Sequence, residues 1–441
     1  MSKKMEALAK RVFIGERVLP PLPRRLSKII ETQTPPGKLL RAGAAKVDIT
    51  PSGSVTMRGF TARRSTGVHR HLYVRALVLD NGDNQLAILS WEKLVPYDLP
   101  RGFKEVASLR EEISKRTGIP SGNILINATH THSGCEGPFE EASIEAVTKA
   151  WESMREARIG VGSKMIYGIG SNRRLPDGTG LWGCNQPNPE GVMDNECGVI
   201  KVEDYDRNII AVLMNYSAHP TVLDANNTLL SGDYAGVAMA EVESALGGDA
   251  VALFLQGCAG DTGTHTFRRK RSISEAERLG RKLAKEVLGI LKHIDVVSWV
   301  PLHAKKKFIR LPLKTGKEAQ RHRIPRIEGE AVRNEIQIFV INDCAIVSVG
   351  SMEAYVEIGL KIKEASPFKH TFTVAYSNGP WLGYLPSEHG YAVNDPDAQE
   401  TPFAPAAVQV LIGECVKLLH KSSSSLKLPP TRKRERSSSR P

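Results

Sequence analysis

Cysteine is scarce in this sequence, and long apolar runs are absent. Its 441 residues include six scattered cysteines and no Cys-x-x-Cys pair, which excludes a disulfide-stapled fold or a zinc ribbon. Free thiols are therefore expected, although the spacing leaves a Cys184–Cys197 disulfide open. No apolar run reaches the length of about 18 residues that a membrane-spanning helix needs, and residues 1–16 lack the uninterrupted apolar stretch of a signal peptide. We expect a soluble, cytoplasmic protein.

Basic residues are in excess only at the two ends of the chain. The formal net charge is +12, but residues 1–41 carry ten Lys/Arg against three Glu, and residues 421–441 carry seven against one. The remaining residues, 42–420, therefore carry a net charge of −1. They show no patch of interleaved aromatic and basic residues, which argues against specific nucleic-acid binding. A weak contact of the basic tails with an anionic surface stays open.

The charge distribution also suggests how the chain is divided. Residues 1–41 mix basic residues with prolines and are expected to form an arm. Residues 42–420 have the composition of one large folded domain. Residues 421–441 are rich in serine and basic residues and are expected to be a disordered tail.

Short apolar strands alternate with amphipathic helices between the two tails. Strands are expected at residues 44–49, 73–80, 86–90, 124–126, 209–214, 250–255, 300–312, 335–341, 345–349 and 371–376, and helices at 103–115, 139–158, 234–246, 274–293, 355–364 and 405–420. Asn81-Gly82 predicts a hairpin turn. Residues 171–197 carry little regular signal, and so long a loop is usually functional. This alternation predicts an α/β fold with mixed sheets flanked by helices.

The sequence Thr129-His130-Thr131-His132-Ser133-Gly134 directly follows the apolar strand 124–126. Two histidines that are two apart on extended chain point to the same side. Because a neutral imidazole is a common metal ligand, this pair predicts a metal site. The alternative is a pair of surface loop histidines.

Other strands are also followed by side chains that could bind a metal or act on a substrate. His219 follows strand 209–214, Asp261 follows 250–255, Glu353 follows 345–349 and Tyr384 follows 371–376. Sheets flanked by helices collect ligands where strand ends open into loops. Each residue also has a structural alternative, such as a core histidine for His219 or a turn cap for Asp261.

Several motifs, taken in order, resemble one known family. They are Val47-Asp48-Ile49-Thr50-Pro51, Gly67-Val68-His69, Ala128 to Gly134, Asn172-Arg173-Arg174, Asn215 to Pro220, Gln256 to Asp261, Glu353 with Glu357 to Leu360, and Asn378 to Tyr384. Together they resemble the neutral/alkaline non-lysosomal ceramidase N-terminal domain family, over about residues 40–420. The chain looks most similar to the short prokaryotic members, which have no C-terminal immunoglobulin-like domain.

The resemblance implies a single α/β catalytic domain that hydrolyses an N-acyl amide bond with one zinc ion (Zn²⁺). The positions that match the family's zinc ligands are His130, His219, Glu353 and Tyr384. His132 and Arg173 match residues near the substrate carbonyl, and Asp261 of the Gly-Asp pair completes the expected catalytic set. The residue types agree, because two histidines and a carboxylate suit zinc, an arginine can bind an oxyanion, and a histidine can move a proton.

One departure from the family pattern concerns the nucleophile. Gly263 stands where full ceramidases carry a nucleophilic serine, so the resemblance implies attack by metal-activated water. The sequence therefore predicts a zinc-dependent hydrolase that acts on a small or lipid-like acyl amide or ester. Whether this substrate is ceramide stays open. The alternative is a non-catalytic descendant that binds a metal or a ligand.

Overall fold

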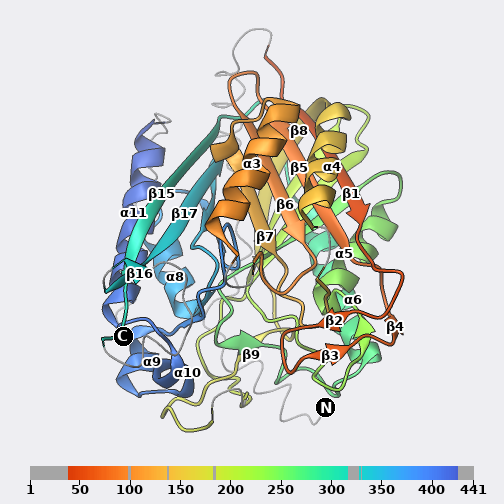
Figure 1. Ribbon diagram of the computed structural model, residues 1–441. Helices are drawn as coiled ribbons and strands as arrows, with labels where there is room; N and C mark the ends of the chain where they lie inside the picture. Colours follow the sequence, from red (N-terminus) through yellow and green to blue (C-terminus); the bar gives the residue numbers. More distant parts are fainter. Residues whose placement is uncertain are drawn as a thin grey trace, which may run out of the picture.

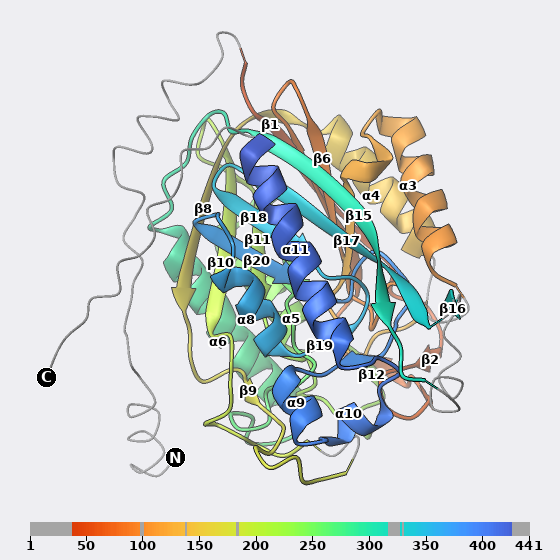
Figure 2. The same ribbon diagram turned by 90° about the vertical axis from the view of Figure 1, so that its left-hand side faces the viewer.

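Two large β-sheets packed against each other form the centre of the molecule (Figures 1 and 2). The computed structural model describes residues 38–97, 101–136, 139–181, 185–315, 327–328 and 330–425. Cys184 lies outside these residues, and the five cysteines within them are buried free thiols. In the described ranges, no helix is both long and apolar enough to cross a bilayer.

The larger sheet has eight strands in the order β13-β11-β10-β8-β1-β5-β6-β7. They are β1 (Arg41–Asp48), β5 (Tyr73–Asp80), β6 (Gln85–Trp91), β7 (Ile124–Ala128), β8 (Arg155–Met165), β10 (Glu196–Asp204), β11 (Ile209–Tyr216) and β13 (Val251–Gln256). The pairs β6–β7 and β11–β13 are parallel, and the others are antiparallel. The predicted hairpin at Asn81-Gly82 is confirmed, because the Asn81 side chain accepts the backbone N–H groups of Asp83 and Asn84.

The smaller sheet contains the strands of the C-terminal part. Its order is β15-β17-β18-β20, with β16 paired to β17. The strands are β15 (Leu302–Pro312), β16 (Ile327–Glu328), β17 (Ala331–Ile341), β18 (Cys344–Ser348) and β20 (His370–Val374). The β18–β20 pair is parallel, and α8 (Val356–Glu364) connects them. The mixed sheets predicted from the sequence are confirmed.

Helices cover the outer face of each sheet. The inner faces meet in one apolar cluster, to which Leu77, Leu213 and Leu253 contribute from the larger sheet, and Phe339 and Phe372 from the smaller. Outside the larger sheet lie α3 (Phe103–Thr117), α4 (Phe139–Glu152), α5 (Asp233–Leu246) and α6 (Ile273–Leu291). Outside the smaller sheet lie α8 and α11 (Ala406–Ser425). The result is a layer of helices, two sheets and a second layer of helices (Figure 2).

Two predicted elements differ most from the structure in their bounds. The helix expected over residues 139–158 ends at Glu152, and β8 begins three residues later at Arg155. Strand β8 packs closely against its neighbours at Gly160, where an added Cβ would lie 2.1 Å from the Asp295 carbonyl oxygen. The expected tail begins with five helical residues, because α11 continues to Ser425 and buries the side chain of Ser422.

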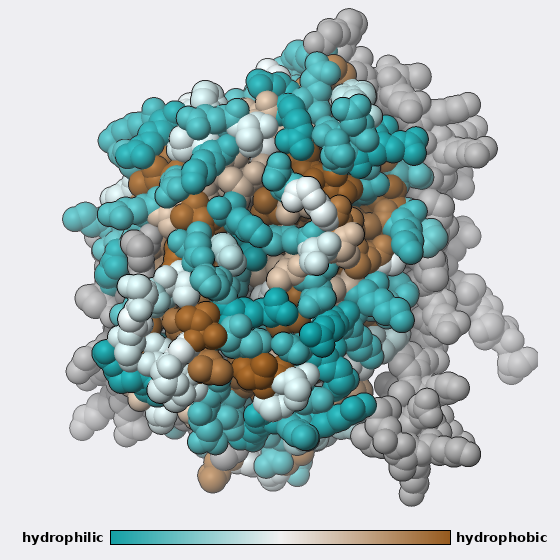
Figure 3. All heavy atoms as spheres, turned by 90° about the vertical axis from the view of Figure 1, so that its right-hand side faces the viewer, coloured by the Kyte–Doolittle hydropathy of each residue, from teal (hydrophilic) through white to brown (hydrophobic). Residues whose placement is uncertain are grey.

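The surface on the side of α6 and β4 (Gly67–Val68) is mainly hydrophilic and is broken by separate apolar patches (Figure 3). Two further short strands lie near this side, namely β2 (Thr56–Met57) and β3 (Arg63–Arg64), which pair as a hairpin. The hairpin lies beside the loop that follows β7, because Arg63 donates to the His132 carbonyl oxygen.

Candidate metal centre

His130 and His132 come from the loop after β7, as expected, but this loop is not extended. His130 has a left-handed backbone with φ of 66°, and its N–H donates to the Lys93 carbonyl oxygen at 2.9 Å. Its ring stacks on Tyr376 with a centroid distance of 3.9 Å. The Nε2 atoms of the two histidines lie 3.2 Å apart. The predicted convergence is confirmed, although a turn produces it rather than the alternation of a strand.

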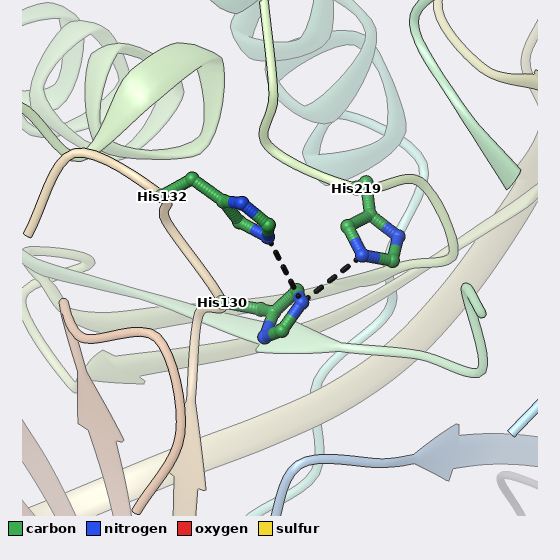
Figure 4. Close-up of side chains that lie close together, drawn as sticks. All are labelled: His130, His132 and His219. Carbon is green, nitrogen blue, oxygen red and sulfur yellow. Dashed lines mark hydrogen bonds between the residues drawn. The ribbon is translucent and has the colours of Figure 1, made fainter. Parts of the chain in front are cut away.

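His219 follows β11 and completes a cluster of three buried imidazoles (Figure 4). Its Nε2 atom lies 3.0 Å from Nε2 of His130. One nitrogen of each of the three rings lies within 4.8 Å of the others. His219 is therefore not merely a core histidine, because its ring faces the His-x-His pair.

Backbone carbonyls determine which ring nitrogens carry protons. Nδ1 of His130 lies 2.6 Å from the Leu94 oxygen, and Nδ1 of His219 lies 2.6 Å from the Ala259 oxygen. Since a carbonyl oxygen only accepts, we assign the proton of each neutral ring to Nδ1. The two Nε2 lone pairs then face each other at 3.0 Å. Such an arrangement is repulsive unless a cation lies between the rings, so these residues fit a metal ion.

Glu353 adds a carboxylate to the cluster. Its Oε2 atom lies 3.0 Å from Nε2 of His219 and 3.5 Å from Nε2 of His130, and this oxygen has no hydrogen-bond donor in the described part of the chain. Three imidazoles and a carboxylate are a donor set that zinc accepts.

Burial keeps His132 and His219 neutral. It lowers the pKa of His219 to about 3, with help from Arg173 and His130. It also lowers the pKa of His132 well below its usual value, with help from His130 and His219. Neutral imidazoles are the form that binds a metal.

Arg173 lies on the same side of the cluster as Tyr384. It follows the short strand β9 (Ser171–Asn172), and its Nη2 atom donates to the Gly260 oxygen at 2.7 Å. The same atom lies 3.3 Å from Nε2 of His219 and 3.4 Å from the Tyr384 hydroxyl. Its Nε is buried without a partner, and Arg173 pairs with no carboxylate in the described ranges. A buried guanidinium that has no carboxylate partner fits an anionic or strongly polar group of a ligand.

A two-residue strand pair aligns Tyr384 with Glu353. Strand β19 (Glu353–Ala354) pairs in parallel with β21 (Tyr384–Leu385), and the register places Glu353 opposite Tyr384. Burial raises the pKa of Tyr384, so the side chain is a neutral phenol in this structure. The structure thus brings Tyr384 to the cluster through Arg173.

Asp261 supports the cluster through backbone contacts. Its carboxylate accepts the Val356 N–H at 2.7 Å and the Asn172 amide at 2.8 Å. Its carbonyl oxygen accepts the Arg173 N–H at 2.8 Å. Burial raises the pKa of Asp261 to about 6. These contacts show Asp261 joining β9 to the start of α8.

Three side chains near the cluster were not among the predicted site residues. The Phe60 ring lies 4.6 Å from the His132 ring, and Tyr376 stacks on His130. Phe60 lies in a loop without periodicity, and Tyr376 lies within a predicted strand, so neither had a local signal. His265 is a third neighbour: a Cβ added at Gly263 would lie 2.8 Å from its Nδ1 and 3.6 Å from the His219 Cβ.

The geometry defines a class of protein, namely an α/β protein with a buried cluster of three histidines and a carboxylate at the ends of its sheets. Comparison with known proteins adds a family likeness. Residues 140–268 match the sequence model of the family described as neutral/alkaline non-lysosomal ceramidase, N-terminal. The family resemblance is thereby confirmed. The matched segment includes Arg173, His219 and Asp261, and His130, Glu353 and Tyr384 lie outside it.

Individual relatives agree with this result. The chain is 26% identical to neutral ceramidase A of Dictyostelium discoideum over 257 residues, which is 51% of this chain and 36% of that protein. It is also 26% identical to the neutral ceramidase of Mycobacterium tuberculosis over 266 residues, 51% of this chain and 40% of that protein. The matches thus span well under half the length of these relatives.

The fold extends the likeness to most of the chain. The crystal structure of neutral ceramidase from Pseudomonas aeruginosa superposes with a TM-score of 0.71 at 17% identity, over 87% of this chain and 75% of that one. A structure titled as ceramidase complexed with C2 gives a TM-score of 0.72 at 16% identity, over 89% of this chain and 76% of that one. At such low identity the superpositions show that the fold is shared.

Proposed function

We propose that this protein is a zinc-dependent hydrolase that cleaves an N-acyl amide or ester bond. The observation that carries the proposal is that two histidine Nε2 atoms and a carboxylate oxygen converge, with the Nε2 atoms of His130 and His219 3.0 Å apart and Oε2 of Glu353 3.0 Å from Nε2 of His219. Such a buried arrangement has no evident structural benefit without a cation, because its lone pairs repel one another.

His130, His219 and Glu353 would hold the ion, with Tyr384 as the fourth ligand that the family resemblance suggests. A bound zinc ion supplies Lewis-acid polarisation of a carbonyl and a lowered pKa for a water molecule. The backbone carbonyls of Leu94 and Ala259 orient two of the imidazoles through Nδ1, as outer partners do at metal sites.

Two side chains are placed to act on the substrate. His132 is neutral, and its Nε2 points at the cluster, so it can accept a proton during the reaction and return it to the leaving group. Arg173 offers a buried guanidinium beside the cluster, where it can donate hydrogen bonds to the oxygen on which negative charge develops. Asp261 keeps the Arg173 backbone in place.

The experiment is a hydrolysis screen of the purified full-length protein with one equivalent of zinc. The panel contains a short-chain ceramide, dodecanoyl and acetyl amides of 7-amino-4-methylcoumarin, and the matching coumarin esters. We expect turnover of at least one compound that disappears in His219→Ala. A wild-type protein that binds zinc and hydrolyses none of them would contradict the proposal.

The second candidate function is a non-catalytic metal-binding or ligand-binding protein. It is favoured by Gly263, where no hydroxyl is available and the His265 ring occupies the space beside the backbone. The same screen separates the two functions, because this second candidate predicts zinc binding, and binding of acyl compounds, without turnover.

A further inference from the structure

Phe60 is an exposed aromatic residue in the turn of the β2–β3 hairpin. Its side chain is 40% exposed, although its ring lies 4.6 Å from the ring of His132. The hairpin pairs Met57 with Arg63, so the turn that carries Phe60 spans few residues. Because this exposed ring contacts an imidazole of the buried cluster, it is placed to touch a ligand bound there.

The turn is fixed to the loop that carries His132. Arg63 donates from Nη2 to the His132 carbonyl oxygen and from Nε to the Asn227 oxygen, each at 2.6 Å. Gly59 has φ of +111°, and a Cβ added there would lie 2.6 Å from Cγ of His132. The backbone on both sides of Phe60 is therefore fixed to the His132 loop, and the Phe60 ring lies between His132 and the Arg63 guanidinium, 5.6 Å from the latter.

The three imidazoles of the cluster differ in their exposure to solvent. His132 is 8% exposed, whereas His130 and His219 are 1% and 0% exposed. Of the three imidazoles, the one nearest to solvent is thus the one that Phe60 contacts. The exposed Phe60 ring therefore lies beside the most exposed of the three histidines.

We propose that Phe60 determines substrate specificity by packing against an apolar chain next to the scissile carbonyl. The inference rests on the proposed function and deepens it, because it assigns an apolar acyl group to the side of the site that His132 occupies. The ring offers apolar area that is already fixed in position, so a long acyl chain gains contact there and an acetyl group does not.

The test compares dodecanoyl and acetyl amides of 7-amino-4-methylcoumarin on the zinc-loaded full chain. We expect Phe60→Ala to lower the ratio of kcat/KM for the dodecanoyl over the acetyl amide about tenfold, and Phe60→Leu to keep the ratio within about threefold. Phe308→Ala is the matched control, because Phe308 is 38% exposed and packs on Phe103 and Arg333, away from the histidines. It should leave the ratio unchanged.

If Phe60→Ala lowers kcat/KM equally for both amides, the inference is overturned, since Phe60 would then act only through His132. An unchanged ratio would overturn it as well. Zinc content and circular dichroism of each variant exclude a folding defect.

A binding measurement separates this inference from the proposed function. Calorimetric titration with dodecanoic acid should give a Kd that is about tenfold weaker in Phe60→Ala than in the wild type. If the wild type cleaves no amide but this difference is found, the hydrolase proposal fails and the Phe60 inference stands. If amides are cleaved but neither the ratio nor the Kd depends on Phe60, the inference fails alone. If neither turnover nor binding is found, both fail.

Discussion

Two buried polar clusters connect distant parts of this chain, and they differ in whether their hydrogen bonds are complete. In the first, Arg110 of α3 donates to both carboxylate oxygens of Glu335 at 2.8 and 3.0 Å, to the Ile124 carbonyl and to Gln337. The Gln337 side chain in turn accepts a hydrogen bond from the Asn378 amide and donates one to the Gly122 carbonyl oxygen. No nitrogen of Arg110 and no oxygen of Glu335 is left unpaired.

The second cluster, around the three histidines, is equally buried but incomplete. Glu353 Oε2, His132 Nδ1 and Arg173 Nε lack hydrogen-bond partners in the described residues, and two Nε2 atoms face each other without a proton between them. Because folding seldom leaves buried polar atoms unpaired, the incomplete cluster indicates a binding site and the complete one a structural link. The difference separates function from stability without reference to any relative.

Arg110→Ala should give the largest stability change. It leaves Glu335 buried and unpaired, which costs about 3–5 kcal/mol of unfolding free energy. Urea denaturation followed by circular dichroism measures this cost. The double variant Arg110→Met, Glu335→Leu should recover most of it, because no charge then stays buried alone. Zinc bound per folded chain should not change in either variant; a loss of zinc would mean that the two clusters are not independent.

His132→Ala should lower kcat about a hundredfold, because a proton acceptor is lost. This corresponds to a rise of about 2.7 kcal/mol in the activation free energy. We expect it to retain zinc, in contrast to variants of the proposed ligands. Inductively coupled plasma mass spectrometry measures the zinc, and steady-state kinetics measure kcat. A zinc-free His132→Ala protein would instead make His132 a ligand, in keeping with the position of its Nε2 atom 3.2 Å from that of His130.

Two threonines beside Gly263 give the smallest effects. The Thr262 hydroxyl donates to the Ser217 oxygen at 2.7 Å, so Thr262→Ala should cost about 1 kcal/mol of stability. The Thr264 hydroxyl has no hydrogen-bond partner among the residues that the structure describes, and Thr264→Ala should be close to neutral. Both should retain activity within about threefold, because neither is a nucleophile. An acyl adduct on either residue, detected by mass spectrometry of the enzyme with substrate, would disprove attack by water.

The sequence predicted the histidine cluster because its members follow apolar strands, and strand ends gather at the edges of sheets. His130 and His132 are two residues apart, and their proximity required no tertiary information. The Arg110–Glu335 pair spans 225 positions, and no local pattern links its members. The contact between Arg63 and His132 likewise spans 69 positions, so the role of the Phe60 turn could not be predicted.

The errors in the predicted elements have local causes. The apolar spacing of α4 continues into Arg155–Met165, but Gly160 and Gly162 in that segment favour close packing of a strand against residues 294–295. The serines at the end of α11 look like part of a disordered tail by composition, yet Ser422 is buried. In both places tertiary packing overrides a local signal.

The most direct test of the central claim is the zinc content of four proteins after dialysis against limiting zinc: the wild type, His130→Ala, His219→Ala and His71→Ala. His71 is exposed and pairs with Asp48, so it controls for the loss of any histidine. We predict about one zinc per chain in the wild type and in His71→Ala, and less than about a tenth in the other two variants. Full zinc occupancy in both His130→Ala and His219→Ala would contradict the account.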